Sequence, residues 1–126
     1  MQKLWLSNGQ KFYNMSEHIL QVNCINWFKL QYPRELIYSI PNGGFRHFST
    51  AKRLKAEGVC SGIPDLFIPT PMGEYHGLYI EMKYGYNKPS PAQKKIMEYL
   101  TKKGYLCAVC WTLDEFIQTI NNYYNL

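Results

Sequence analysis

Apolar residues recur at helical spacing in the first third of the chain. Val22, Ile25 and Phe28 lie three residues apart, a spacing that places their side chains on one face of an α-helix. Ser16 precedes this run and can accept a hydrogen bond from a backbone N–H of the first turn, and a proline follows the run. The pattern predicts a helix over residues 16–31.

A two-residue alternation follows in the second half of the chain, over residues 78–84. Ile80 and Met82 would lie on one side of a strand there, and Glu81 and Lys83 on the other side. One face of this strand is therefore apolar, whereas the other carries an acid and an amine.

The other predicted elements are apolar runs bounded by turn and capping residues. We predict a short buried strand over residues 36–40, which runs into the turn residues 41–44, and apolar strands over residues 65–69 and 105–111. We predict three further helices: a short basic one capped by Ser49 and ended by Gly58, one from a capping box at Ser90 to Gly104, and a last one capped by Thr112.

These elements follow one another in the order α-β-α-β-β-α-β-α. Helices interleaved with strands indicate a small α/β sandwich around a mixed sheet. The 126 residues suit a single domain, residues 1–126, and the chain contains no repeat or linker. Residues 1–15 fit an N-terminal dimer arm, an extra strand or a loose tail, and the pattern does not choose among them.

The composition of the chain favours a polyanionic partner. Fourteen Lys and Arg residues against nine Asp and Glu give a formal charge of +5, which favours nucleic acid. Four cysteines are too few for the disulfide framework of a small secreted protein. The N-terminus lacks the apolar core of a signal peptide and no apolar run reaches the roughly 20 residues of a membrane span, so we expect a soluble protein in the cytoplasm.

The most informative chemistry lies at Asp65 and Glu81. If residues 70–77 connect the two strands as a hairpin, counting back along the antiparallel pair places Asp65 beside Glu81 or Met82. Two adjacent carboxylates repel unless they share a proton, are well solvated or bind a cation. Carboxylate oxygens, together with backbone carbonyls and water, suit Mg²⁺ or Mn²⁺.

Lys83 would share the face of Glu81 and lie close to such an ion. An ion that polarises a phosphoryl oxygen, beside an ammonium group that stabilises charge developing at phosphorus, is suited to phosphodiester cleavage. Each residue alone is more simply explained as a turn residue or a solvated edge-strand side chain. Together, Asp65 before one strand and Glu81 with Lys83 in the next favour a functional site.

These residues resemble the VRR-NUC domains, a branch of the PD-(D/E)XK nuclease superfamily. Pro64 with Asp65, and Glu81 to Lys83, match the superfamily core, and residues 58–66 with Ser90 to Gln93 look like the VRR-NUC version. Residues 41–44 also fit. The resemblance implies a restriction-endonuclease-like sandwich, with a central mixed β-sheet flanked by helices.

The resemblance also implies metal-dependent DNA cleavage and a role for each site residue. It makes Asp65 and Glu81 metal ligands, Lys83 the catalytic lysine and Gln93 a supporting active-site residue, and we expect the backbone carbonyl of Met82 to complete the ligand set. It further suggests Glu17 as a catalytic residue that binds the metal directly or through water, supported by Gln21 and Ser90. Glu17 is also explained as a first-turn acid favoured by the helix dipole, and Gln93 as part of a capping box.

Basic residues flank this set and are candidates for phosphate contacts. An ordinary solvated cationic surface explains any one of them, but the basic balance of the chain favours a joint role in DNA binding. They are Arg46, His47, Lys52, Arg53, Lys55, Lys88, Lys94 and Lys95.

The function expected from these observations is a Mg²⁺- or Mn²⁺-dependent DNA endonuclease. By resemblance, we expect a homodimer that acts on branched DNA such as Holliday junctions or flaps, of a kind found in phages. A catalytically silent DNA-binding module with the same fold is the alternative, and a restriction-type enzyme that reads a short site is a third.

Cys107 and Cys110 would face opposite sides of one strand and so are not expected to bind one metal.

Overall fold

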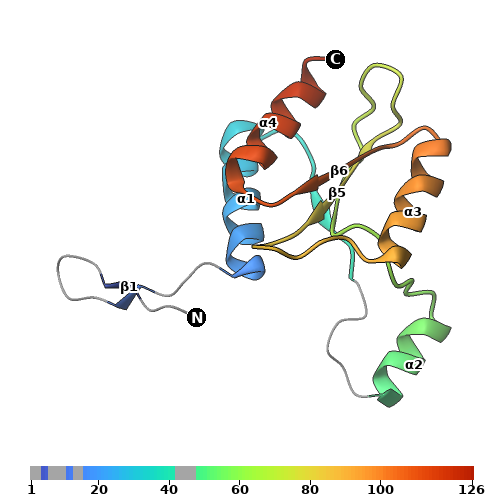
Figure 1. The fold of residues 1–126 in the computed structure, drawn as a ribbon. Helices are drawn as coiled ribbons and strands as arrows, with labels where there is room; N and C mark the ends of the chain where they lie inside the picture. Colours follow the sequence, from blue (N-terminus) through green and yellow to red (C-terminus); the bar gives the residue numbers. More distant parts are fainter. Residues whose placement is uncertain (1–3, 6–10, 13–15, 42–47) are drawn as a thin grey trace.

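A computed structural model describes residues 4–5, 11–12, 16–41 and 48–126 (Figure 1). In chain order the elements are β1 (Leu4–Trp5), β2 (Lys11–Phe12), α1 (Glu17–Gln31), β3 (Tyr38–Ser39), α2 (Phe48–Ala56), β4 (Leu66–Ile68), β5 (Leu78–Met82), α3 (Pro91–Lys102), β6 (Leu106–Cys110) and α4 (Leu113–Tyr124). The predicted order of helices and strands is confirmed from α1 onward. The predicted turn at 41–44 lies outside the described residues beyond Pro41, as do Arg46 and His47.

The main sheet has four strands in the order β3-β4-β5-β6. β3 pairs antiparallel with β4, β4 pairs antiparallel with β5, and β5 pairs parallel with β6. The parallel pair needs a crossover, and α3 supplies it. The sheet is therefore mixed, as predicted, and a single hairpin joins its two central strands.

Two layers of helices enclose this sheet. Figure 1 shows α1 and α4 on one face and α3 on the other, whereas α2 stands apart from the sandwich. The core lies between the sheet and the α1–α4 layer, because the alternating residues of β4 and β5 point there. Its fully buried members include Phe28 of α1, Leu66 of β4, Ile80 of β5 and Phe116 of α4, each of which gains about 1.5–3 kcal/mol from burial.

Local signals position the helices around the sheet. The Ser16 hydroxyl accepts a hydrogen bond from the Ile19 N–H at 3.2 Å and caps α1. Ser90 and Gln93 form the predicted capping box of α3, and Thr112 caps α4 through the Glu115 N–H. Gly58, with φ of +101°, follows α2 in the conformation predicted for a helix stop.

The segment between α2 and β4 passes close to α3 and requires glycine. Gly62 has φ of +91°, a conformation that other residues rarely adopt. A Cβ there would also lie 3.1 Å from the Ala92 carbonyl oxygen and 3.3 Å from a side-chain carbon of Ile96. Gly62 thus lets the chain pass the first turns of α3 directly before Asp65.

Three local predictions are wrong or incomplete. β3 was predicted as buried, but both of its residues are exposed because it forms the edge of the sheet and only β4 flanks it. α2 begins at Phe48, so Ser49 lies inside the first turn and is not the cap. β1 and β2 pair with each other and not with the main sheet, so the extra strand considered for residues 1–15 is a separate two-stranded unit.

Candidate active site

Asp65 and Glu81 meet as the hairpin register predicts. Leu66 pairs with Ile80 across β4 and β5, so the preceding residue of one strand, Asp65, lies opposite the following residue of the other, Glu81. The Asp65 carboxylate accepts a hydrogen bond of 2.8 Å from the Met82 N–H. The two carboxylates therefore lie together at one end of the central hairpin.

Glu81 is a buried acid, and its two carboxylate oxygens have different surroundings. Its side chain is 2% exposed, and one oxygen, Oε1, accepts a hydrogen bond of 2.9 Å from Gln93 Nε2 and lies 3.3 Å from Lys83 Nζ. Its other oxygen, Oε2, is buried and has no hydrogen-bond partner among the described residues. A buried acceptor without a partner is costly, so this oxygen has capacity for a further ligand.

The pKa of Glu81 is raised to about 7, first by burial and then by the neighbouring Asp65 charge, against the opposing effect of Lys83. The pKa of Glu17 is also raised, first by burial and then by the Asp65 charge. Two acids with raised pKa values beside a third carboxylate are typical of a functional site. A bound cation would relieve the repulsion on which these shifts partly depend.

Glu17 approaches this pair from the first residue of α1. Its charge interacts with those of Asp65 and Lys83, and Gln21, one turn later, lines the same cleft. Ser16 fixes where α1 begins, and with it the position of Glu17. The start of α1 and the hairpin of β4 and β5 thus meet at one site, although they are far apart in the sequence.

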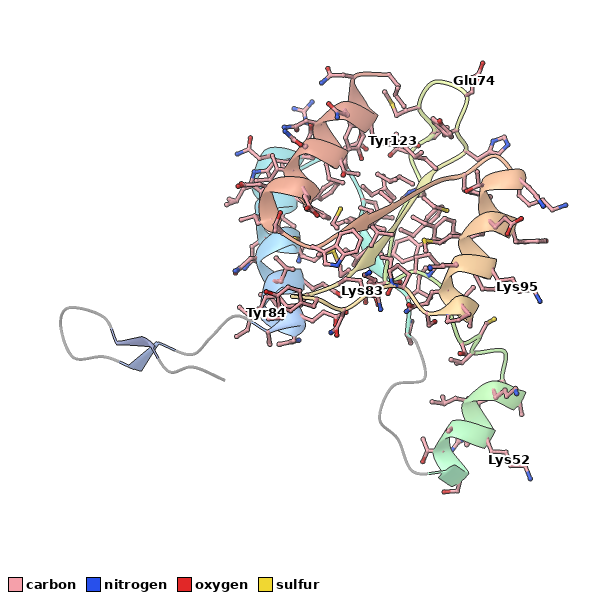
Figure 2. The ribbon with its side chains drawn as sticks, in the orientation of Figure 1. Lys52, Glu74, Lys83, Tyr84, Lys95 and Tyr123 are labelled. Atoms are coloured by element: carbon pink, nitrogen blue, oxygen red, sulfur yellow. The ribbon has the colours of Figure 1, made fainter. Side chains whose placement is uncertain are left out.

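One cleft of about 1140 Å³ contains these side chains. It lies where the start of α1, the start of β4 and the end of β5 meet α2 and the start of α3, and Figure 2 shows Lys83 there between α1 and α3. Eight predicted site residues line this cleft: Glu17, Gln21, Lys55, Asp65, Glu81, Lys83, Ser90 and Gln93.

Gln93 has both of the roles considered for it. Its Oε1 accepts a hydrogen bond of 2.8 Å from the Ser90 N–H, which completes the capping box, while its Nε2 donates to Glu81. The same side chain therefore sets the start of α3 and orients the buried acid.

The donor set suits a divalent ion bound by a carboxylate pair. Among the described residues, no group of three or more His, Cys, Asp or Glu side chains is close enough to hold a metal ion, so Glu17 does not complete a three-carboxylate cluster with Asp65 and Glu81. The unpartnered Glu81 Oε2 beside Asp65 fits an oxygen-binding ion that takes its other ligands from backbone and water. The backbone carbonyl of Met82 stays a predicted ligand.

Comparisons with known proteins show the family of the chain. The VRR-NUC domain model matches residues 3–112. The chain belongs to the VRR-NUC domain family. A solved structure named VRR_NUC domain protein is 33% identical, with a TM-score of 0.76 over 91% of this chain and 93% of that one.

A second solved structure, named VRR_NUC domain, shares the fold alone. It is 22% identical, with a TM-score of 0.54 over 82% of this chain and 96% of that one. No curated protein matches the sequence significantly. VRR-NUC domains are typically nucleases, and the restriction-endonuclease-like α/β fold is confirmed.

The predicted phosphate-contacting residues of this VRR-NUC domain are spread around the cleft. Of those in the described part of the chain, Lys55 lines it, while the others lie outside its lining. Arg53 forms an exposed ion pair with Glu57 at 3.2 Å. Figure 2 shows Lys52 on α2 and Lys95 on α3, where Lys95 points away from the sheet.

Sequence reasoning missed several residues that line the VRR-NUC cleft. Ser39 and Ile40 of the sheet edge, and Cys60 and Ser61 before Gly62, form part of its wall. The glycines at 58 and 62 are the available signal, since they bring this segment against α3. Cys107 and Cys110 are free cysteines on β6 and lie outside the cleft. No described helix has the length and apolar character needed to cross a membrane.

Proposed function

We propose that this VRR-NUC domain is a metal-dependent DNA endonuclease. The observation that carries the proposal is the convergence of Asp65, Glu81 and Lys83 in one cleft, with Oε2 of Glu81 buried and unpartnered among the described residues. A merely structural acid pair would be expected to satisfy each buried oxygen within the protein. Family membership supports nuclease chemistry in general, and the metal and the DNA substrate are our extension of it.

Asp65 and Glu81 would hold Mg²⁺ or Mn²⁺, and Glu17, which forms no three-carboxylate cluster with them, would contact the ion through water. Such an ion supplies polarisation of a phosphoryl oxygen and a lowered pKa of water. Both acids are suited to this because their oxygens are hard ligands, with Asp65 directly before β4 and Glu81 within β5.

The chain's own residues account for positioning and charge stabilisation. Lys83 extends from the end of β5, and its ammonium group, 3.3 Å from Glu81 Oε1, would also donate to the phosphate oxygen on which negative charge develops. Gln93 holds Glu81 from the opposite side at 2.9 Å. Because both partners bind Oε1, Oε2 is kept available.

DNA would lie across the cleft against basic side chains of α2 and α3. Lys55 reaches the cleft lining itself, and Lys94 and Lys95 are exposed on α3 beside it. Such contacts bind phosphates without reading sequence, so affinity should fall steeply with salt. Branched DNA is the proposed substrate, a homodimer the proposed assembly and the cytoplasm the proposed location.

The test is cleavage of labelled four-way, flapped and linear DNA with Mg²⁺, Mn²⁺ or EDTA. We expect cleavage only with metal, and we expect Asp65→Ala and Lys83→Ala to reduce it by at least 100-fold, since electrostatic catalysis by one group contributes about this much. Binding measured in EDTA should change little.

Two outcomes would contradict the proposal. Tight binding by a wild-type protein that cuts no substrate with either metal would favour the catalytically silent DNA-binding module. Cleavage by Lys83→Ala at the wild-type rate would remove the role given to that residue. Discrete bands from a mixed linear substrate would instead favour a restriction-type enzyme.

A further inference from the structure

The loop that joins β5 to α3 begins and ends in the cleft. Lys83 at its start and Ser90 at its end both line the cavity. Tyr86 follows Lys83 by three residues, so their Cα atoms are at most about 11 Å apart. Tyr86 therefore lies on a short loop with both ends at the candidate active site.

This loop is held in one conformation by hydrogen bonds at its centre. The Asn87 N–H donates to the Tyr84 carbonyl at 3.2 Å, which closes a turn, and Gly85 adopts a φ of +63° within it. The Asn87 carbonyl accepts a hydrogen bond of 2.7 Å from the indole N–H of Trp111, which follows β6. The sheet thus fixes the turn that carries Tyr86.

The Tyr86 side chain is presented wholly to solvent. Its exposed fraction is 103%, the largest among the exposed large hydrophobic residues of the described chain. A buried tyrosine stabilises the folded protein through the apolar area that it removes from water, and the exposed ring of Tyr86 contributes no such stability. Lys88, two residues later, is also exposed, so this loop carries both an exposed ring and an exposed cation.

Resting on the proposed function, we propose that Tyr86 stacks on an unpaired base of the DNA strand held at Asp65 and Glu81. The ring and Lys88 match the two parts of a nucleotide, a base with a π-face and a charged phosphate. A base inside a continuous duplex is already stacked on both faces and offers none to an external ring. Tyr86 thereby selects DNA with an unpaired base next to the phosphodiester that is cut.

A fluorescence experiment tests stacking without cleavage. An oligonucleotide duplex carries 2-aminopurine in an unpaired flap or, as a control, within continuous duplex, and is titrated with protein in EDTA. We expect wild-type protein and Tyr86→Phe to change the fluorescence of the unpaired probe, and Tyr86→Ala to lose that change together with about ten-fold in affinity. Tyr99→Ala, which removes an exposed ring from α3 outside the cleft lining, should behave as wild type.

Cleavage with Mg²⁺ provides the second measurement. Tyr86→Ala should lose about ten-fold in kcat/KM on flapped DNA and less than two-fold on continuous duplex, whereas Tyr86→Phe keeps the wild-type preference. Equal losses on both substrates, or no loss on either, would overturn the stacking proposal and leave the endonuclease intact. A wild-type protein that binds the flapped probe but cuts nothing would instead refute the proposed function, and the fluorescence result would still decide the role of Tyr86.

Discussion

The two carboxylate oxygens of Glu81 differ in their hydrogen-bond partners. Oε1 has two donors, from Gln93 and Lys83, and Oε2 has none among the described residues. Burial and the Asp65 charge together outweigh the attraction of Lys83, so the pKa of Glu81 rises to about 7. In the protein without metal, Glu81 therefore binds a proton more readily than an exposed glutamate does.

This shift predicts how stability depends on pH in EDTA. The folded pKa of about 7 lies above the ordinary value of 4.5, so between these values the folded state binds more protons than the unfolded state. The contribution of Glu81 is thus fully present below about pH 4.5 and is lost as pH rises through 7. Urea unfolding of wild type and Glu81→Gln should show wild type losing on the order of 1–3 kcal/mol relative to the variant between pH 5 and pH 8.

The matched variant isolates this effect, because glutamine keeps the shape of the side chain but cannot ionise. A constant difference in unfolding free energy between the two proteins across this range would show that the pKa of Glu81 is not raised in the folded protein.

At the scale of elements, the start of α3 links helix capping to the site. Gln93 completes the capping box with Ser90 and also donates to Glu81. The capping box was predictable, because its residue types and spacing are local. The family resemblance implied that Gln93 supports the active site, but its bond to Glu81 could not be derived from spacing, because that bond depends on how closely α3 approaches β5.

Gln93→Ala should therefore affect both stability and cleavage. We expect a loss of about 1 kcal/mol from the helix cap and at least a ten-fold lower cleavage rate, since Glu81 loses a donor that orients it. Thr112→Ala is the control, because Thr112 is the N-cap of α4 and accepts a hydrogen bond from the Glu115 N–H at 3.1 Å, so its loss also weakens a helix cap, but it lies outside the cleft. Equal cleavage rates for these two variants would remove the orienting role of Gln93.

Other features of the elements show where sequence patterns reach their limit. The hairpin length and the alternation of residues 78–84 predicted Asp65 beside Glu81 or Met82, and the register of β4 and β5 places it opposite Glu81. The exposure of β3 did not follow, because an apolar run does not reveal whether a strand lies at the edge of a sheet. Ser39 and Cys60 reach the cleft only through the packing of distant segments.

At the scale of the whole molecule, the cleft lies where both helical layers meet the end of the central hairpin. α1 contributes Glu17 from one layer and α3 contributes Gln93 from the other. The order of the elements predicted this α/β sandwich, because alternating helices and strands have few compact arrangements. The position of α2, apart from the sandwich in Figure 1, did not follow from its basic residues and its capping signals.

A chain of 14.8 kDa covers little DNA, and the proposed homodimer would bring two cleavage sites to one branched substrate. Sedimentation equilibrium should give twice the chain mass in the absence of DNA. A monomer that retains cleavage of four-way junctions at the same concentration would contradict the proposed assembly and leave the active site unaffected.

The central claim is that Asp65 and Glu81 share one divalent cation, and Mn²⁺ anomalous diffraction from crystals soaked in MnCl₂ tests it most directly. The account predicts one strong anomalous peak within coordination distance of carboxylate oxygens of both residues, and its loss in crystals of Asp65→Asn. A protein that crystallises with this cleft open to solvent and shows no peak there, or shows Mn²⁺ bound only elsewhere, would contradict the account.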